Sequence, residues 1–213
     1  MTSLELMADE VQVWVASLAV NEKRYAELSS CMPPEEIEHS TSLHPIAARR
    51  YVVARGILRN LLSGFTGTDP RKLRFSYGAS GKPALADRVD IQFNISHSAD
   101  LGLFAFSPDR PVGVDVENER PVRRLLDVAQ RFMSDNELRT LAETPEDKRN
   151  TEFLRSWVVR EARLKAEGKG VWSGNASQSP KLTHRLFAPK PGYIAAVAAP
   201  DTDWRLYTCS MKD

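Results

Sequence analysis

One predicted helix places two charged side chains on its apolar face. At about 100° per residue, the segment 153–165 gathers Leu154, Val158 and Ala162 into one arc, and Glu161 and Lys165 fall near its centre. An exposed Glu–Lys pair four residues apart would stabilise a helix only slightly. Burying either charge is costly unless a metal, a phosphate or the opposite charge compensates it. We therefore expect a functional site here, with a buried structural ion pair as the alternative.

A second acidic group lies in the alternating sequence PVGVDVEN, residues 111–118. Successive side chains of a strand point to opposite faces, so Asp115 and Glu117 share a face, about 6–7 Å apart. Acidic residues are poor strand formers, and the alternative is a solvated outer face. Together with Glu161 they make three carboxylates. Such a set suits Mg²⁺, with Mn²⁺ also possible, because Mg²⁺ takes oxygen ligands and shares its shell with substrate phosphates.

Basic and polar residues elsewhere could contact a diphosphate. Lys82 lies in the Gly-flexed turn SGKP, and Ser96 and His97 lie at the end of the predicted strand FNISHS. A lone histidine is more often a satisfied surface or core residue, and Gly–Lys–Pro also occurs in ordinary turns. The sequence has no Walker loop and no Gly-x-Gly-x-x-Gly run, which excludes P-loop and Rossmann nucleotide sites. No Cys/His cluster favours zinc.

Four motifs carry a family resemblance: GKP (81–83), FNISHS (93–98), VGVDVE (112–117) and WVVREARLK (157–165). In this order they resemble the motifs of the 4′-phosphopantetheinyl transferases, and in particular of the larger, monomeric Sfp-type branch. The resemblance implies transfer of the phosphopantetheine arm from coenzyme A to a serine hydroxyl of an acyl or peptidyl carrier protein. Adenosine 3′,5′-bisphosphate would be the other product.

The resemblance also implies roles for individual residues. Asp115, Glu117 and Glu161 would hold Mg²⁺ against the diphosphate of coenzyme A. Glu161, or a metal-bound water beside it, would be the general base, and Lys165 would steady the diphosphate and the leaving group. The remaining contacts to coenzyme A would come from Lys82, Ser96 and His97 at the phosphates and from Arg50 at the 3′-phosphate end.

Two features depart from the family pattern. Arg160 stands where the family usually has lysine, and it falls outside the apolar arc. Because arginine stays protonated, we expect Arg160 to bind coenzyme A or the acidic carrier rather than to exchange a proton. The segment 31–45, CMPPEEIEHSTSLHP, is acidic where relatives are often basic. Arg49, Arg50 or His44 would then have to hold the 3′-phosphate.

Carrier helices are typically acidic around the modified serine, so a basic, partly apolar docking surface is expected. The helix after VGVDVE offers candidates, with a solvated helix face as the alternative: Arg123, Arg124, Arg131, Phe132 and Met133. Two other functions remain possible from the residues. One is a Mg²⁺-dependent diphosphate hydrolase that acts on coenzyme A. The other is a non-catalytic module that binds coenzyme A or a carrier, for which the carboxylate triad should be broken.

The elements that position these residues indicate an α+β fold. We predict strands over 11–20, 91–107 and 111–119, a helix over 44–64 capped by Gly64, helices over 122–143 and 151–168, and a closing hairpin in the tail. The segments 51–59 and 157–165 echo each other, which favours two similar α+β halves, 1–109 and 110–213. The resemblance implies the same duplicated fold, with the active site in the cleft between the halves.

Composition and charge narrow the class of protein and its location in the cell. A 42% hydrophobic and 27% charged chain of 213 residues is typical of a folded soluble protein. The net charge of +1 argues against general attraction to nucleic acid or membrane. We see no secretory signal or membrane-spanning run, and Cys31 and Cys209 have no metal-ligand spacing. We therefore expect a cytoplasmic protein of a size typical of enzymes, and the family resemblance implies that it is a monomer.

Overall fold

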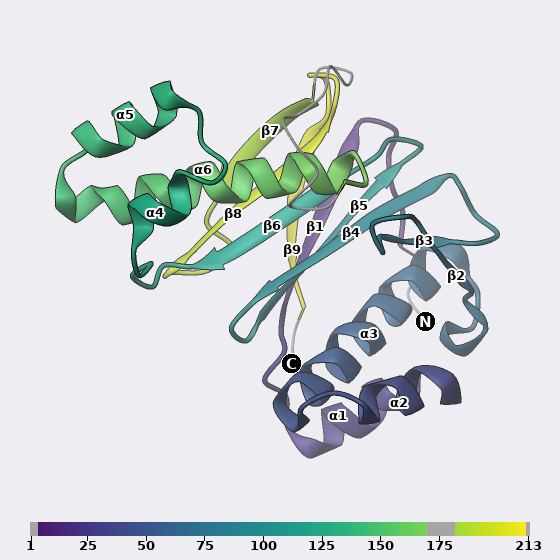
Figure 1. Ribbon diagram of the computed structural model, residues 1–213. Coiled ribbons are helices and arrows are strands. Elements are labelled where there is room, and N and C mark those ends of the chain that lie inside the picture. The colour runs from purple at the N-terminus through teal and green to yellow at the C-terminus, as the bar shows by residue number, and fades with distance from the viewer. Residues whose placement is uncertain (1–3, 170–181, 212–213) are drawn as a thin grey trace.

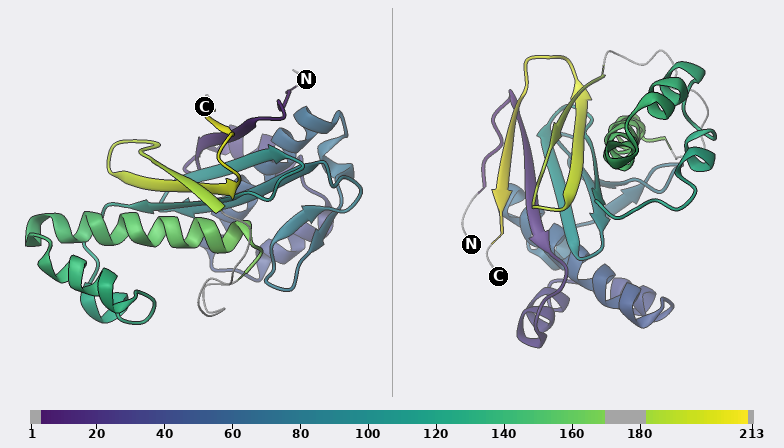
Figure 2. Two further views of the ribbon diagram at one scale, coloured as in Figure 1. Left: turned by 90° about the horizontal axis from the view of Figure 1, so that it is seen from above. Right: turned by 90° about the vertical axis from the view of Figure 1, so that its left-hand side faces the viewer.

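Two β-sheets form the centre of the computed structural model, which describes residues 4–169 and 182–211 (Figures 1 and 2). The first sheet has the strand order β4-β5-β1-β9, made of Ile91–Ser98, Leu101–Pro108, Glu10–Ser17 and Arg205–Ser210. The second has the order β6-β8-β7, made of Gly113–Asn118, Tyr193–Pro200 and Leu182–Phe187. A short hairpin is formed by β2 (Phe75–Tyr77) and β3 (Pro83–Leu85).

The inner faces of the two sheets pack on each other. Val112, Val114 and Val116 of the β6 segment share one apolar cluster with residues of β1, β5 and β8. These valines alternate with Gly113, Asp115 and Glu117, so the strand turns its acidic side chains away from this cluster. The predicted alternation is therefore confirmed.

Two long helices cover the outer faces. Helix α3 (Pro45–Thr66) packs on the first sheet against Phe93, Phe104 and Phe106. Helix α6 (Glu146–Ala166) packs on the second sheet. The shorter helices are α1 (Glu22–Ser29), α2 (Pro34–Thr41), α4 (Leu125–Ala129) and α5 (Asp135–Glu143), with a 3₁₀ turn at Pro70–Lys72. Within the described part of the chain, no helix is both long and apolar enough to cross a membrane.

The end of α3 differs from the prediction. Gly64 lies inside the helix, which ends at Gly67 with a φ of 69°. This left-handed conformation favours glycine, so Gly67 is the C-cap. Gly64 instead allows close packing, since a Cβ there would lie 2.8 Å from Leu4 Cδ1.

The closing hairpin predicted in the tail is confirmed in part. β7 and β8 pair antiparallel as a hairpin, but β9 crosses to the first sheet and pairs parallel with β1. The α+β class is therefore confirmed. The division into halves 1–109 and 110–213 stays a prediction, and β9 is the strand that crosses this boundary.

Candidate active site

Strand β6 and helix α6 approach each other closely at Gly113. A Cβ at this position would lie 2.0 Å from the carbonyl oxygen of Ala162 and 2.3 Å from the backbone nitrogen of Ala166. Real side chains do not tolerate such distances, so any other residue would push α6 away from the sheet. Gly113 therefore sets the spacing that lets side chains of α6 reach those of β6.

The ammonium group of Lys165 lies on the acidic face of β6. Its Nζ is 2.6 Å from Asp115 Oδ1 and 3.1 Å from Ser96 Oγ. Ser96 Oγ in turn donates a hydrogen bond to Asp115 Oδ1 at 2.8 Å. The ion pair of Lys165 is thus made with Asp115 of the strand and not with Glu161, its neighbour on the helix.

Glu161 and Asp115 are buried at 5% exposure each. The helical projection predicted this position for Glu161, whereas the strand pattern predicted only the face of Asp115 and left its burial open. Among the residues that the structure describes, Asp115 Oδ2 and Glu161 Oε1 are buried without a hydrogen-bond partner. Buried carboxylate oxygens without donors are costly. They have the chemistry that a hard cation requires of its ligands.

The electrostatics of the three carboxylates are unfavourable as they stand. Burial raises the pKa of Asp115, and Lys165 and Ser96 offset this only in part. Burial also raises the pKa of Glu161, and the nearby charge of Asp115 raises it further. Burial likewise raises the pKa of Glu117. Lys165 is in direct contact with Asp115, and the charges of Arg120 and Arg160 offset only part of the upward pKa shifts of Glu117 and Glu161.

The carboxylates do not surround a common point. Across residues 4–169 and 182–211, no three Asp, Glu, His or Cys side chains are gathered into a metal-binding cluster. The cation that interacts directly with Asp115 is the ammonium of Lys165. The unpartnered oxygens fit a divalent cation, but holding one with all three carboxylates would require at least one side chain to turn.

Strand β4 supplies a polar row beside β6 that the sequence analysis identified only in part. Asn94 Oδ1 accepts a hydrogen bond from Val114 N at 2.9 Å. Ser98 Oγ donates to Glu117 Oε2 at 2.9 Å. Both residues were missed, although Asn94, Ser96 and Ser98 alternate in FNISHS and the strand period alone places them on one face.

Lys82 lies in the connection between β2 and β3, and its side chain reaches the C-terminal end of α6. Its Nζ donates to the carbonyl oxygens of Val112 at 2.9 Å and of Lys165 at 2.7 Å. Ser80 Oγ of the same hairpin connection donates to the carbonyl oxygen of Gly168 at 2.6 Å. Burial lowers the pKa of Lys82 to about 8. The structure thus places Lys82 beside the site through backbone contacts, and its contact to a phosphate stays a prediction.

Arg50 and His97 form a separate basic group near the β4–β5 turn. Arg50 Nη2 is 2.8 Å from Asp100 Oδ1 in this turn. His97 is exposed and points to the opposite face of β4 from Ser96. Desolvation by its surroundings lowers the pKa of His97, and the positive charges of Lys165 and Arg50 lower it further. Arg50 and His97 are therefore close enough for their charges to interact.

Arg49 is directed elsewhere. Its Nη2 donates to the carbonyl oxygen of Val20 at 2.8 Å and pairs with Glu22 Oε1 at 3.0 Å, and its guanidinium lies 4.5 Å from the ring centre of Tyr25. These contacts fasten α3 to α1. His44, at the N-cap of α3, is exposed.

One glutamate of the acidic segment 31–45 pairs with arginines of α3, which the sequence did not reveal. Glu36 of α2 pairs with Arg55 at 2.9 Å and with Arg59 at 2.8 Å, and both arginines are buried. The guanidinium of Arg55 also lies 4.2 Å from the ring centre of Phe75. Glu36 therefore pairs with two arginines of α3, which gives one of the three glutamates of the segment a structural role.

Arg160 lies on the outer side of α6, as predicted. Its guanidinium is 5.7 Å from the ring centre of Phe132, and its Nε is buried without a hydrogen-bond partner in the described part of the chain. Phe132 packs edge-on against Trp157 at 4.8 Å. Arg155 and Arg163 are exposed, which confirms their predicted place on the solvated side.

The candidate docking residues divide into two kinds. Arg123, Arg124 and Arg131 are exposed, and Arg124 pairs with Asp127 at 2.6 Å. Phe132 and Met133 are partly buried and pack against the apolar cluster under α6, so packing accounts for them.

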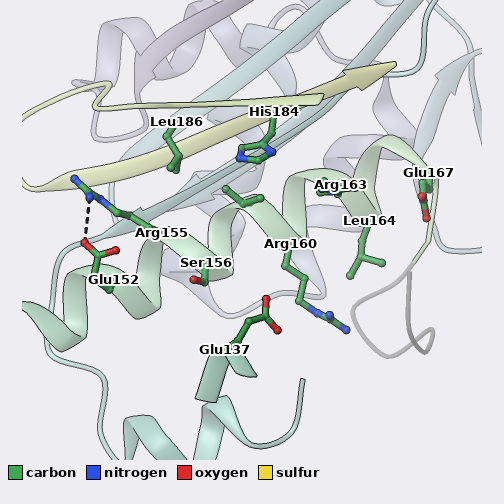
Figure 3. A pocket seen from close by; sticks show the side chains of 11 residues that line it. Glu137, Glu152, Arg155, Ser156, Arg160, Arg163, Leu164, Glu167, His184 and Leu186 are labelled. Carbon is green, nitrogen blue, oxygen red and sulfur yellow. Dashed lines mark hydrogen bonds and ion pairs between the residues drawn. The ribbon is translucent and has the colours of Figure 1, made fainter. Parts of the chain in front are cut away.

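The outer face of α6 has a hollow of about 600 Å³ that is not lined by Asp115, Glu117 or Glu161 (Figure 3). Figure 3 shows Glu137 and Arg160 on one side of the helix, and His184 and Leu186 of β7 on the other. Glu161 and Lys165 do not line it, so this hollow is distinct from the candidate active site.

The sequence has relatives of known class. Residues 111–207 match the family model of the 4′-phosphopantetheinyl transferase superfamily. The 4′-phosphopantetheinyl transferase HetI of Nostoc sp. is 35% identical over 173 residues, which are 79% of this chain and 73% of the relative. The 4′-phosphopantetheinyl transferase Sfp of Bacillus subtilis is 33% identical over 143 residues, 67% of this chain and 62% of the relative. AcpT of Escherichia coli, named a 4′-phosphopantetheinyl transferase, is 30% identical over 123 residues, 58% of this chain and 60% of the relative.

Proposed function

Because this chain belongs to the 4′-phosphopantetheinyl transferase superfamily, we propose that it transfers the 4′-phosphopantetheine group of coenzyme A to a serine hydroxyl of an apo acyl or peptidyl carrier protein. The observation that carries the proposal is the buried cluster of Asp115, Glu161 and Lys165. Two of its carboxylate oxygens are buried and unpartnered among the described residues. The cluster lies inside the region that matches the family.

The proposed reaction is a substitution at phosphorus. The serine oxygen of the carrier forms a bond to the phosphorus that bears pantetheine. The bond between that phosphorus and the oxygen bridging the two phosphates breaks, and adenosine 3′,5′-bisphosphate leaves with the bond's electron pair. We assign the serine proton to Glu161, because its buried Oε1 has no hydrogen-bond partner among the described residues and can accept a proton.

Mg²⁺ or Mn²⁺ fits the unpartnered oxygens, and Asp115, Glu117 and Glu161 would hold it. When bound, such an ion neutralises negative charge on phosphate oxygens. Lys165 would exchange its contact with Asp115 for one with the diphosphate, where an ammonium stabilises the charge that develops on the leaving group.

The remaining coenzyme A contacts follow the two basic groups of the structure. Ser96 and Lys82 lie at the carboxylate cluster and would face the diphosphate. Arg50 and His97 lie together near the β4–β5 turn and would hold the 3′-phosphate. Both arginines are already paired, Arg50 with Asp100 and Arg49 with Glu22. Arg49 is less suited to this role, because it also bonds the carbonyl oxygen of Val20 and lies over the ring of Tyr25, away from His97.

The proposed site lies between the two predicted halves. Ser96 of β4 belongs to residues 1–109, and its partner Asp115 belongs to residues 110–213. The helix predicted over 122–143 is divided into α4 and α5, with Arg124 at the N-cap of α4 and Phe132 in the turn between the two helices. The carrier would dock on this region, where Arg124 and Phe132 are the candidates and Arg160 lies over Phe132. The protein would act as a cytoplasmic monomer.

The test is incubation with coenzyme A, Mg²⁺ and a panel of apo carrier proteins, followed by mass spectrometry. At least one carrier should gain the mass of the phosphopantetheine arm. Asp115→Ala should abolish the gain, whereas Asp87→Ala, which removes an exposed carboxylate paired with Arg74, should not. A panel without any modified carrier would contradict the proposal. Coenzyme A consumed in the absence of carrier would favour the hydrolase instead.

A further inference from the structure

The free edge of β6 is satisfied by side chains and not by another strand. In the described structure β6 pairs only with β8, which leaves backbone N–H groups on its other edge. Val114 N donates to Asn94 Oδ1 at 2.9 Å, and Asn118 N donates to Ser98 Oγ at 3.1 Å. Side chains of β4 therefore fix the position of β6 at two points, on either side of the acidic residues.

Ser98 makes a second contact, to Glu117. Its Oγ donates to Glu117 Oε2 at 2.9 Å, and the residue is 8% exposed. A hydroxyl has one proton to donate. An ionised carboxylate can only accept hydrogen bonds, so the serine proton is donated to Glu117 while the serine oxygen accepts from Asn118 N–H. Burial limits the replacement of either bond by water.

The two serines of β4 differ in what holds them. Ser96 lies between Asp115 and the ammonium of Lys165, a flexible side chain that the proposed reaction would move. Ser98 lies between Glu117 and a backbone N–H, which stays fixed with the strand. Ser98 is thus the more rigid support of the two.

The side chain of Glu117 has room for a second position. It lines a hollow beside α6 together with Arg120, Val122 and Trp157. The positive charge of Arg120 acts on the Glu117 carboxylate. Without the bond from Ser98, this carboxylate would be drawn toward Arg120 and away from Asp115.

We propose that Ser98 is a positioning residue that holds Glu117 beside Asp115, in reach of the divalent cation and the coenzyme A diphosphate. The inference rests on the proposed function for the identity of the ligands. It adds that the cation affinity of the site depends on a serine hydroxyl that touches neither the cation nor the substrate.

The test compares Ser98→Ala, Ser98→Thr and a matched control, Ser107→Ala. Ser107 is a buried serine of the same sheet whose hydroxyl, among residues 4–169 and 182–211, donates to the backbone oxygen of Glu10 at 3.4 Å and to no carboxylate. Mn²⁺ binding in the presence of coenzyme A is measured by electron paramagnetic resonance, without any transfer reaction. Transfer rates are then measured against Mg²⁺ concentration.

Loss of the Ser98 hydroxyl should raise the Mn²⁺ dissociation constant about tenfold, the effect typical of removing a residue that orients a metal ligand. The Mg²⁺ concentration needed for half-maximal transfer should rise equally, while KM for the carrier stays unchanged. Ser98→Thr, which keeps the hydroxyl, should restore both quantities, and Ser107→Ala should match the wild type. If Ser98→Ala does not fold, Ser98→Cys keeps the size but weakens the donor, and should raise the same constant.

Unchanged Mn²⁺ affinity in a folded Ser98→Ala or Ser98→Cys protein would overturn the inference. So would a loss of transfer that excess Mg²⁺ does not reverse. A wild type that modifies carriers while these variants bind Mn²⁺ normally would reject the role of Ser98 and leave the transferase standing. A wild type that binds Mn²⁺ but modifies no carrier would reject the transferase alone.

Discussion

Two buried charged clusters lie on the two long helices, and they are completed to different degrees. On α3, Arg55 and Arg59 share the carboxylate of Glu36, and both oxygens of Glu36 accept hydrogen bonds. On α6 and β6, one oxygen of Asp115 is bonded, while its Oδ2 and Glu161 Oε1 have no partner within the described residues. The first cluster is satisfied and the second is not.

The pKa values of the carboxyl groups show the same contrast. Burial alone would raise the pKa of Glu36, but the hydrogen bonds and charges of Arg59 and Arg55 outweigh it and lower that pKa. Burial raises the pKa of Asp115 and of Glu161, and their neighbours do not reverse the shift. In the structural cluster both oxygens of the carboxylate are hydrogen-bonded by the arginines, whereas a site built for a ligand leaves carboxylate oxygens for that ligand to bind.

The largest expected effect is on stability, at the satisfied cluster. Glu36→Gln should lower the free energy of unfolding by about 3–5 kcal/mol, because it leaves two buried guanidinium groups without their counter-charge. Urea unfolding at neutral pH measures the difference. Transfer activity per folded molecule should be unchanged, since Glu36 does not contact the carboxylate cluster.

The control for this prediction is Glu38→Gln, an exposed glutamate of the same helix. It should leave the free energy of unfolding unchanged. Because the pKa of Glu36 is lowered in the folded state, its contribution is lost as the pH falls through that pKa. The gap between wild type and Glu36→Gln should therefore shrink in acid. An equal loss in both variants would show that Glu36 has no special role.

A smaller effect on the free energy of unfolding is expected at Lys82, which joins the β2–β3 hairpin to α6. Burial lowers its pKa from 10.5 to about 8 in the folded protein. Between these values the unfolded chain binds more protons, so the stability of the wild type relative to Lys82→Met should rise from pH 8 to pH 10. Denaturant unfolding of both proteins across this range checks the sign. A pH-independent difference would contradict the buried position of this ammonium group.

The smallest effect is expected at the surface. Arg124 is exposed, so reversing its charge should change the apparent KM for the carrier by only about two- to fivefold, the range of an exposed ion pair. The KM for coenzyme A should not change. Lys23→Glu, a charge reversal on the distant helix α1, is the control. Equal effects of Arg124→Glu on both KM values would rule out docking.

Sequence periodicity was sufficient to place the carboxylates. The strand period put Asp115 and Glu117 on one face, and the helix period put Glu161 and Lys165 against the core. Both patterns are local, so each residue could be assigned from its own element. The same strand period could also have identified Ser98, which was not singled out although it alternates with Ser96.

Contacts between elements could not be predicted in this way. The pairing of Glu36 with Arg55 and Arg59 depends on how α2 packs on α3. The contact of Lys82 with the carbonyl oxygen of Lys165 joins residues more than eighty positions apart. No local pattern encodes either contact, because tertiary packing decides both.

The end of α3 was misplaced for a related reason. Either Gly64 or Gly67 could end a helix by residue type, and the structure has the left-handed φ of 69° at Gly67. Local sequence signals alone do not distinguish the two.

The central claim is that the carboxylate cluster is incomplete until it binds a divalent cation and coenzyme A. The most direct measurement is thermal unfolding of the wild type and of Asp115→Asn, first in chelator and then with Mg²⁺ and coenzyme A. In chelator, Asp115→Asn should lose less stability than Glu36→Gln, because it removes the counter-charge of Lys165 but also relieves one of three neighbouring negative charges. With both ligands, the unfolding temperature of the wild type should rise by mass action, while that of Asp115→Asn should not. The same rise in both proteins would contradict the account.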